Sequence, residues 1–167
     1  MKRKHVTRTA LGAAASVVAL VSVVAAAPPA SAVVTRGCYQ NERKFALPHK
    51  PDVTVRILLC AERAGSVVNA EASVYWFGSG GIIGGTRFND FKITLNAERN
   101  DVVKATRTFT ETGRLNDAYS NHVDLAVTAS APGHGGWSAD GQVIVDINDD
   151  GAGDYIWALH GSSPLIS

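Results

Sequence analysis

The sequence lacks the short motifs that identify many catalytic sites. It contains no H-E-x-x-H or other paired-histidine spacing for zinc, and no G-x-S-x-G elbow for a nucleophilic serine. Three of its histidines are isolated along the chain: His49, His134 and His160. The sequence therefore favours a non-catalytic protein, and a hydrolase would need a site assembled from distant residues.

One local constellation could suggest a triad. Ser120, His122 and Asp124 occupy alternate positions, which a strand places on one face. Same-face neighbours on a strand are separated by roughly 6.6 Å, whereas a nucleophile and its base need hydrogen-bond contact. We therefore interpret these residues as a solvated strand face.

Long apolar runs are scarce, and only residues 11–27 form one without charge. Four basic residues and no acidic residue precede this run: Lys2, Arg3, Lys4 and Arg8. A small-residue triplet, A-S-A, follows and ends at Ala32. These are the three parts of a secretory signal peptide. We expect cleavage after Ala32, a secreted extracellular protein and one domain over residues 33–167. A permanent membrane anchor is the alternative.

The sequence also lacks an excess of basic charge. It has 16 basic and 15 acidic residues, and four of the basic ones lie in the leader, which leaves 12 against 15. The mature chain is thus mildly acidic. This charge argues against a nucleic-acid-binding protein, which needs a basic face, and against attraction to anionic lipid.

Cysteine is almost absent, and its two copies are Cys38 and Cys60. No C-x-x-C spacing or cysteine–histidine cluster suggests a metal site. In an exported protein a lone pair predicts one disulfide, which would tie the N-terminal segment to the rest of the domain.

The mature chain is rich in alternating apolar and polar residues, the pattern of half-buried strands. The apolar positions within 53–59, 91–97, 123–129 and 143–147 each share one face. The stretch 66–77 tolerates a helix, but its β-branched and aromatic residues favour a strand. We predict no helix elsewhere. The fold class predicted is all-β, an antiparallel β-sandwich or barrel of about seven to eight strands.

Turn signals separate these segments. They are Asn100-Asp101, Gly113 with Asn116-Asp117, "APGHGG" at 131–136, and the hairpin-type dipeptide Asp140-Gly141. The spacing of the turns is consistent with a single domain without internal repeats.

The stretch "DINDDGAGD", residues 146–154, is the most informative local pattern. Counting from Asp146, oxygen-bearing side chains fall at positions one, three, five and nine: Asp146, Asn148, Asp150 and Asp154. Gly151 at position six permits a sharp reversal. Calcium takes six to eight oxygen ligands, and carboxylates at this spacing can supply several. A polar hairpin turn is the alternative, since these residue types also favour turns.

These nine residues resemble the calcium loops of the D-x-[DN]-x-D-G-x-x-D type. Such loops occur in helix-loop-helix hands, in dockerins and between strands of integrin-type propeller repeats. The resemblance implies side-chain ligands at Asp146, Asn148, Asp150 and Asp154 and a carbonyl ligand at Ala152. A helical hand needs glutamate at position twelve, where this chain has Trp157, so the strand-loop-strand version fits better. Extracellular calcium sites often have dissociation constants of about 0.1–1 mM, so at about 1 mM free calcium they stabilise a fold by only ~0.4–1.4 kcal/mol. We therefore predict a structural ion that orders this loop without holding the whole fold together.

The aromatic residues suggest how a ligand could be bound. Trp137 follows the glycine-rich loop that contains His134, and exposed rings on loops often contact ligands. We therefore predict Trp137, His134 and Tyr119 as ligand-binding candidates, with core packing of Trp137 as the alternative. The architecture loosely resembles carbohydrate-binding modules and other small secreted sandwiches. The function predicted is a secreted, non-catalytic module that binds an extracellular carbohydrate or protein. A small secreted hydrolase, a protease inhibitor and a cell-surface structural component remain alternatives.

Overall fold

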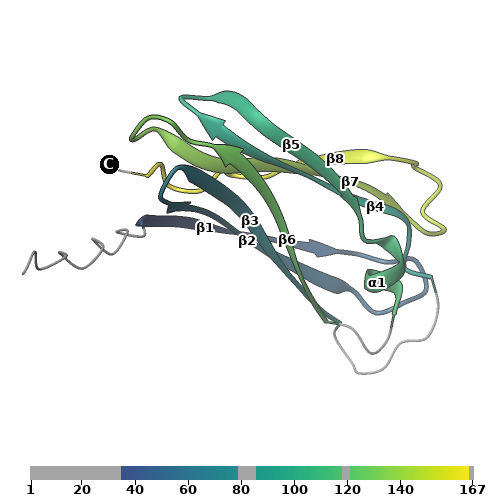
Figure 1. Ribbon diagram of the computed structural model, residues 1–167. Helices are drawn as coiled ribbons and strands as arrows, with labels where there is room; N and C mark the ends of the chain where they lie inside the picture. The colour runs from purple at the N-terminus through teal and green to yellow at the C-terminus, as the bar shows by residue number, and fades with distance from the viewer. Residues whose placement is uncertain (1–34, 79–85, 118–120, 166–167) are drawn as a thin grey trace, which may run out of the picture. The chain divides into compact units, whose positions relative to one another are not determined.

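The computed structural model describes residues 35–78, 86–117 and 121–165, so the predicted leader lies outside the described residues. The described residues form eight strands and one short helix (Figure 1). The strands are β1 (Thr35–Phe45), β2 (Val53–Ala64), β3 (Val67–Gly78), β4 (Phe88–Arg99), β5 (Val102–Thr110), β6 (His122–Ser130), β7 (Trp137–Ile147) and β8 (Tyr155–Ala158). The helix, α1, spans Thr112–Asn116.

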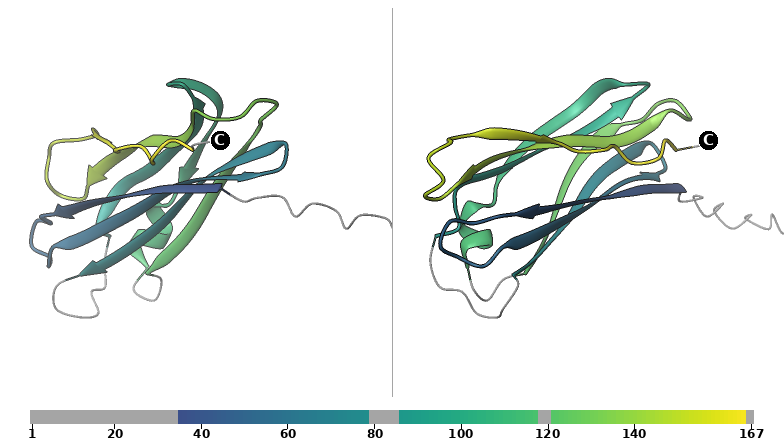
Figure 2. Two further views of the ribbon diagram at one scale, coloured as in Figure 1. Left: turned by 90° about the vertical axis from the view of Figure 1, so that its left-hand side faces the viewer. Right: turned by 180° about the vertical axis from the view of Figure 1, so that it is seen from behind.

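The strands make two four-stranded antiparallel sheets. Sheet A has the order β1-β2-β3-β6, and sheet B has the order β5-β4-β7-β8. Figures 1 and 2 show the sheets as two layers, with β1 and β8 at the same side of the sandwich. The two sheets do not close into a barrel. The predicted all-β sandwich is confirmed.

Alternation explains which residues form the core between the sheets. The apolar residues of β2 from Val53 to Leu59 are fully buried at every second position, and those of β4 from Phe91 to Ala97 behave likewise. Intervening polar residues face solvent. The ambiguous stretch 66–77 forms β3, with Val74 and Trp76 buried. The strand predictions therefore hold because a period of two leaves one face of each strand apolar.

Two turn predictions have different outcomes. Asn100 and Asp101 both have positive φ, 50° and 60°, as a tight hairpin turn between β4 and β5 requires. The predicted turn at Asp140-Gly141 is wrong, because both residues lie inside β7. A Cβ at position 141 would collide with the carbonyl of Thr94 on β4. Gly141 thus permits close approach of two strands rather than a reversal.

The segment from Gly113 to Asn116 was predicted to be a turn, but it forms α1. Leu115 is fully buried and anchors the helix to the core. Oδ1 of Asn116 accepts hydrogen bonds from the backbone nitrogens of Arg87 and Phe88, and its Nδ2 donates to the Phe88 carbonyl. This one side chain thus pairs with the backbone where β4 begins.

The C-terminal segment joins the two sheets at the β1–β8 side. Nδ2 of Asn41 on β1 donates to the His160 carbonyl at 2.9 Å, and Oδ1 accepts from the His160 nitrogen at 2.6 Å. A Cβ at Gly37 would collide with the Ser163 carbonyl, so this segment lies directly against β1. The predicted disulfide is confirmed, since Cys38 and Cys60 are direct cross-strand partners joined by a bond.

Candidate functional site

The acidic loop between β7 and β8 holds the residues predicted to bind calcium. Lys50, which precedes β2, donates through Nζ to Oδ1 of Asn148 at 2.7 Å and lies 3.5 Å from Oδ2 of Asp149. Asn89 accepts from Nδ2 of Asn148 at 2.9 Å and donates to Oδ1 of Asp146 at 3.3 Å. The ammonium of Lys50 therefore provides positive charge in the first half of the loop.

The second half of the loop is held in a similar way. Oδ1 of Asp150 accepts from the backbone nitrogen of Ala152 at 2.9 Å, which is a local Asx turn. A hydrogen bond to Asp90 raises the pKa of the Lys92 ammonium, and the charge of Asp154 adds to this effect. Lysines thus lie close to acidic residues on both sides of the loop.

These contacts bear on how calcium would fit. Among residues 35–78, 86–117 and 121–165, no group of three or more histidine, cysteine, aspartate or glutamate side chains is arranged to hold a metal ion. Gly151 has a φ of 67°, as the predicted reversal requires. Because calcium needs six to eight oxygens, Lys50 would have to leave Asn148 and the carboxylates would have to turn inward. Calcium binding by this loop stays a prediction.

The three predicted ligand-binding residues, Trp137, His134 and Tyr119, have different outcomes. The expectation that Trp137 is exposed is wrong: it is 2% exposed, and its Nε1 donates to the Gly133 carbonyl at 3.4 Å. Side chains alternate between the two faces of β7, and this alternation directs the indole into the core. The guanidinium of Arg99 lies over its ring. His134 is exposed. Tyr119 lies outside the described residues.

Two arginines, one from each sheet, hold the 131–136 loop. Arg63 donates to the carbonyls of Ala131 and Gly133 at 2.8 and 2.5 Å, and Arg99 donates to the carbonyl of His134 at 3.2 Å. Hydrogen bonds from side chains to backbone carbonyls help to fix the path of a loop. The loop therefore belongs to the framework that joins the two sheets.

Exposed rings gather instead on the outer face of sheet A. Tyr75 and Phe77 of β3 are 41% and 46% exposed, on either side of the buried Trp76. His122 of β6 lies opposite Tyr75, and their rings stack at a centroid distance of 4.4 Å. We call Tyr75, Phe77 and His122 the aromatic strip.

Charged neighbours order the aromatic strip. Arg56 on β2 donates through Nε and Nη2 to the same oxygen of Glu42 on β1, at 2.9 and 2.8 Å. The guanidinium of Arg56 lies 5.4 Å from the centre of the Phe77 ring. Cation–π contact and a paired carboxylate restrict how this ring moves. On the β2 side, the Phe77 end of the strip thus lies against an exposed ion pair.

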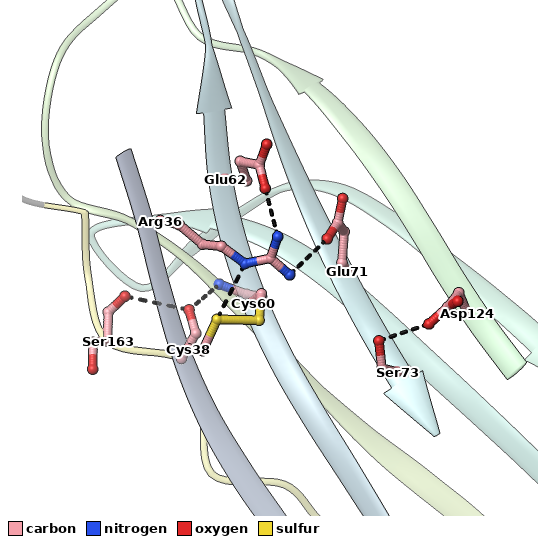
Figure 3. Close-up of a disulfide and its surroundings, with 10 residues drawn as sticks. Arg36, Cys38, Cys60, Glu62, Glu71, Ser73, Asp124 and Ser163 are labelled. Carbon is pink, nitrogen blue, oxygen red and sulfur yellow. Dashed lines mark hydrogen bonds and ion pairs between the residues drawn. A yellow bond between two sulfur atoms is a disulfide. The ribbon is translucent and has the colours of Figure 1, made fainter. Parts of the chain in front are cut away.

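A polar hollow lies further along the same face. It has a volume of about 390 Å³ and is lined by Arg36, Glu71, Ser73, Asp124, Leu125 and Ala126. Figure 3 shows Arg36 beside the Cys38–Cys60 disulfide, with its guanidinium between Glu62 and Glu71. The two ion-pair distances are 2.8 and 3.2 Å, and Nε of Arg36 lies 3.4 Å from Sγ of Cys38.

The wall of the polar hollow formed by β3 and β6 contains an ordered polar group. Ser73 donates to Oδ1 of Asp124 at 2.6 Å, and Nε2 of His122 lies 3.0 Å from the same oxygen (Figure 3 shows the first contact). The expected separation of His122 and Asp124 is therefore wrong, because side chains lean along a strand and close the gap. Ser120 lies outside the described residues. The carboxylate lies between serine and histidine, whereas a triad needs the base on the nucleophile.

Sequence reasoning missed the aromatic strip, although a signal for it was present. Asn69, Glu71 and Ser73 are polar at every second position of β3, and the same phase continues to Tyr75 and Phe77. Two aromatic residues that continue a polar phase are expected on the solvent face. The cross-strand position of His122 could not be read from the chain, because it depends on the pairing of β3 with β6.

The chain matches no protein-family model, no curated protein and no solved structure. Within the part of the chain that the structure describes, no helix has the length and apolar character needed to cross a membrane.

Proposed function

We propose that this chain is exported and acts as a non-catalytic binding module that recognises an extracellular carbohydrate or protein. The binding surface proposed is the outer face of sheet A, from the aromatic strip to the polar hollow. The N-terminal pattern of a basic segment, an apolar run and A-S-A supports export. A disulfide between the only two cysteines is consistent with an oxidising compartment.

The observation that carries the proposal is the adjacent exposure of three rings on a sheet face. Single exposed apolar residues are common and need no explanation. Here the rings of Tyr75 and His122 stack, Phe77 is two residues further along the same face of β3, and the guanidinium of the Arg56–Glu42 pair lies over the Phe77 ring. Ordered aromatic rings beside polar groups can pack against the apolar face of a sugar ring or of a protein side chain. Little ordering entropy is lost when such rings are already held.

The polar contacts support a binding role over a hydrolytic one. Ser73 and His122 both contact Oδ1 of Asp124. The carboxylate therefore lies between the hydroxyl and the imidazole, whereas a catalytic histidine would have to contact the serine directly. Such an arrangement can orient hydrogen-bonding groups toward a ligand. A structural calcium ion in the acidic loop remains part of the proposal, at the end of β7 and with no role in the binding surface.

The test is binding of purified mature protein to a panel of insoluble polysaccharides and immobilised extracellular proteins. We expect the double variant Tyr75→Ala/Phe77→Ala to bind at least tenfold more weakly, because the apolar area that each ring buries contributes about 1–2 kcal/mol to the free energy of binding. Ile156→Ala is the matched control, since Ile156 is 62% exposed on sheet B. Equal binding by the double variant and the control would refute the assignment of this face.

A further inference from the structure

Most donors in the lining of the polar hollow already have partners, whereas several of its acceptors do not. Its strongest donor, the Arg36 guanidinium, is directed at Glu62, Glu71 and Cys38, and the hydroxyl of Ser73 is directed at Asp124. Among the described residues, no donor contacts Oε1 of Glu71 or Oδ2 of Asp124. The groups left free are mainly acceptors, namely these two carboxylate oxygens and the lone pairs of Ser73, beside two of the five N–H groups of the Arg36 guanidinium. A ligand group that lies between Glu71 and Asp124 can pair with the free carboxylate oxygens by supplying N–H or O–H donors.

The charges at the hollow specify the ligand further. The guanidinium of Arg36 contacts the carboxylates of Glu62 and Glu71, and Asp124 adds a third carboxylate in the lining of the hollow. The guanidinium is already paired with two of these carboxylates, whereas within residues 35–78, 86–117 and 121–165 the carboxylate of Asp124 has no cationic partner except His122 when it is protonated. An anionic ligand would meet unfavourable charge here, and a cation would be attracted.

The aromatic strip supplies the remaining part of the site. Tyr75 is the next outward residue after Ser73 on β3, so the two backbone positions are about 6.6 Å apart along the strand. Its partner His122 also contacts Asp124 at the wall of the hollow. A flat apolar surface and a set of acceptors are thus adjacent and share one residue.

Resting on the proposed function, we propose that the ligand is a glycan with protonated amines. A sugar ring packs against Tyr75, and the amine attached to that ring enters the polar hollow between Glu71 and Asp124. An ammonium supplies three donors and one positive charge, which match the free acceptors and the charge of the hollow. N-acylation would remove the charge and two of these donors.

The experiment compares three soluble probes by calorimetric titration of the mature protein, buffered below the pKa of the sugar amine. The probes are a glucosamine oligomer, the N-acetylglucosamine oligomer of the same length, and a lysine oligomer. We expect the free-amine glycan to bind about tenfold more tightly than its acetylated counterpart, the effect of one or two charged hydrogen bonds at an exposed site. Added salt should reduce this difference.

Glu71→Gln is the informative variant, because Arg36 keeps its ion pair with Glu62 when Glu71 loses its charge. It should reduce the preference for the free amine over the acetylated glycan to about threefold or less. Asp52→Asn is the matched control: it removes the same charge from an exposed ion pair with Lys44, away from the hollow. It should retain the full preference.

The outcomes separate the two proposals. Equal binding of free-amine and acetylated glycans, both weakened by Tyr75→Ala, would overturn the amine assignment and leave the binding face intact. Tighter binding of the lysine oligomer would overturn the choice of a glycan. An amine preference that Glu71→Gln leaves unchanged would overturn the placement of the amine in the hollow. Binding of either glycan that is insensitive to Tyr75→Ala would contradict the proposed face itself.

Discussion

At the scale of single residues, Asn41 shows how a polar side chain in a β-sandwich can stabilise it. The side chain is 8% exposed, yet both of its polar atoms are paired with the backbone of His160. An amide can satisfy one backbone N–H and one C=O at once, which is the pairing that an extra strand would otherwise provide. Asn41 therefore links β1 of sheet A to the segment that follows β8 of sheet B.

Replacement of Asn41 by leucine tests this link. The substitution keeps the volume similar but leaves the His160 nitrogen and carbonyl without partners, so we expect a loss of about 1–3 kcal/mol in the free energy of unfolding. Urea denaturation measures it. Gln40→Leu on the exposed face of the same strand should change stability by no more than about 0.5 kcal/mol. Similar losses in both variants would mean that the pairing is not responsible.

At the scale of elements, the β7–β8 hairpin gathers acidic residues that other segments neutralise. Lys50, from the β1–β2 connection, contacts Asn148 and Asp149, whereas Lys92 of β4 pairs with Asp90 and interacts with Asp154 of the loop only through its charge. Clustered carboxylates repel one another unless positive charge is near. Two lysines provide that charge here, and a calcium ion would have to compete with Lys50 for Asn148.

Lys50→Met tests whether calcium can take the place of the ammonium. Without calcium, we expect the variant to lose about 1–3 kcal/mol of stability, because charged hydrogen bonds to Asn148 and to the Thr86 carbonyl disappear. If the loop binds calcium, about 1 mM calcium should then stabilise Lys50→Met by more than it stabilises the wild type, with a gain of up to about 1.4 kcal/mol.

The measurement is thermal unfolding with calcium and with a chelator. Lys44→Met serves as the control, since Lys44 makes an exposed ion pair with Asp52. It should show the same calcium response as the wild type. The absence of a calcium-dependent shift in all three proteins would remove calcium from the description of this loop.

At the scale of the whole molecule, two buried carboxyls at different ends of sheet B couple folding to pH. Burial raises the pKa of Glu98 above its usual value of 4.5, and the charges of Asp140 and Asp101 raise it further. Burial also raises the pKa of Glu111, an effect that Arg114 partly opposes. The folded chain holds these protons more tightly than the unfolded chain does, so these groups lower stability as pH rises from about 4.5.

Glu98→Gln combined with Glu111→Gln isolates this effect. Glutamine resembles the protonated acid, so we expect the double variant to be more stable than the wild type at neutral pH and to lose this advantage as pH falls toward 4.5. Urea titrations across this range measure the difference. An advantage that grows in acid would have the wrong sign and would refute the assignment.

Much of this protein follows from its sequence alone. Alternation with a period of two is a local property, and it identifies the inner faces of β2, β4 and β7 without knowledge of their partners. The pairing of Cys38 with Cys60 follows from the fact that the chain has two cysteines. Errors arose where local residue types have two uses: Gly141 serves close strand packing instead of a turn, and the chain around Leu115 forms a helix because the core accepts that side chain.

The tertiary structure alone decided which distant groups meet. Lys50 reaches Asn148 across 98 positions, and Asn41 reaches His160 across 119. Pairing of β3 with β6 places His122 beside Tyr75 and Ser73 beside Asp124, which assembles the proposed binding face from residues that are distant in sequence. The physical reason is that a residue pattern fixes which side of a strand is apolar. The order and register of strands depend instead on packing of the whole core, in which every strand takes part.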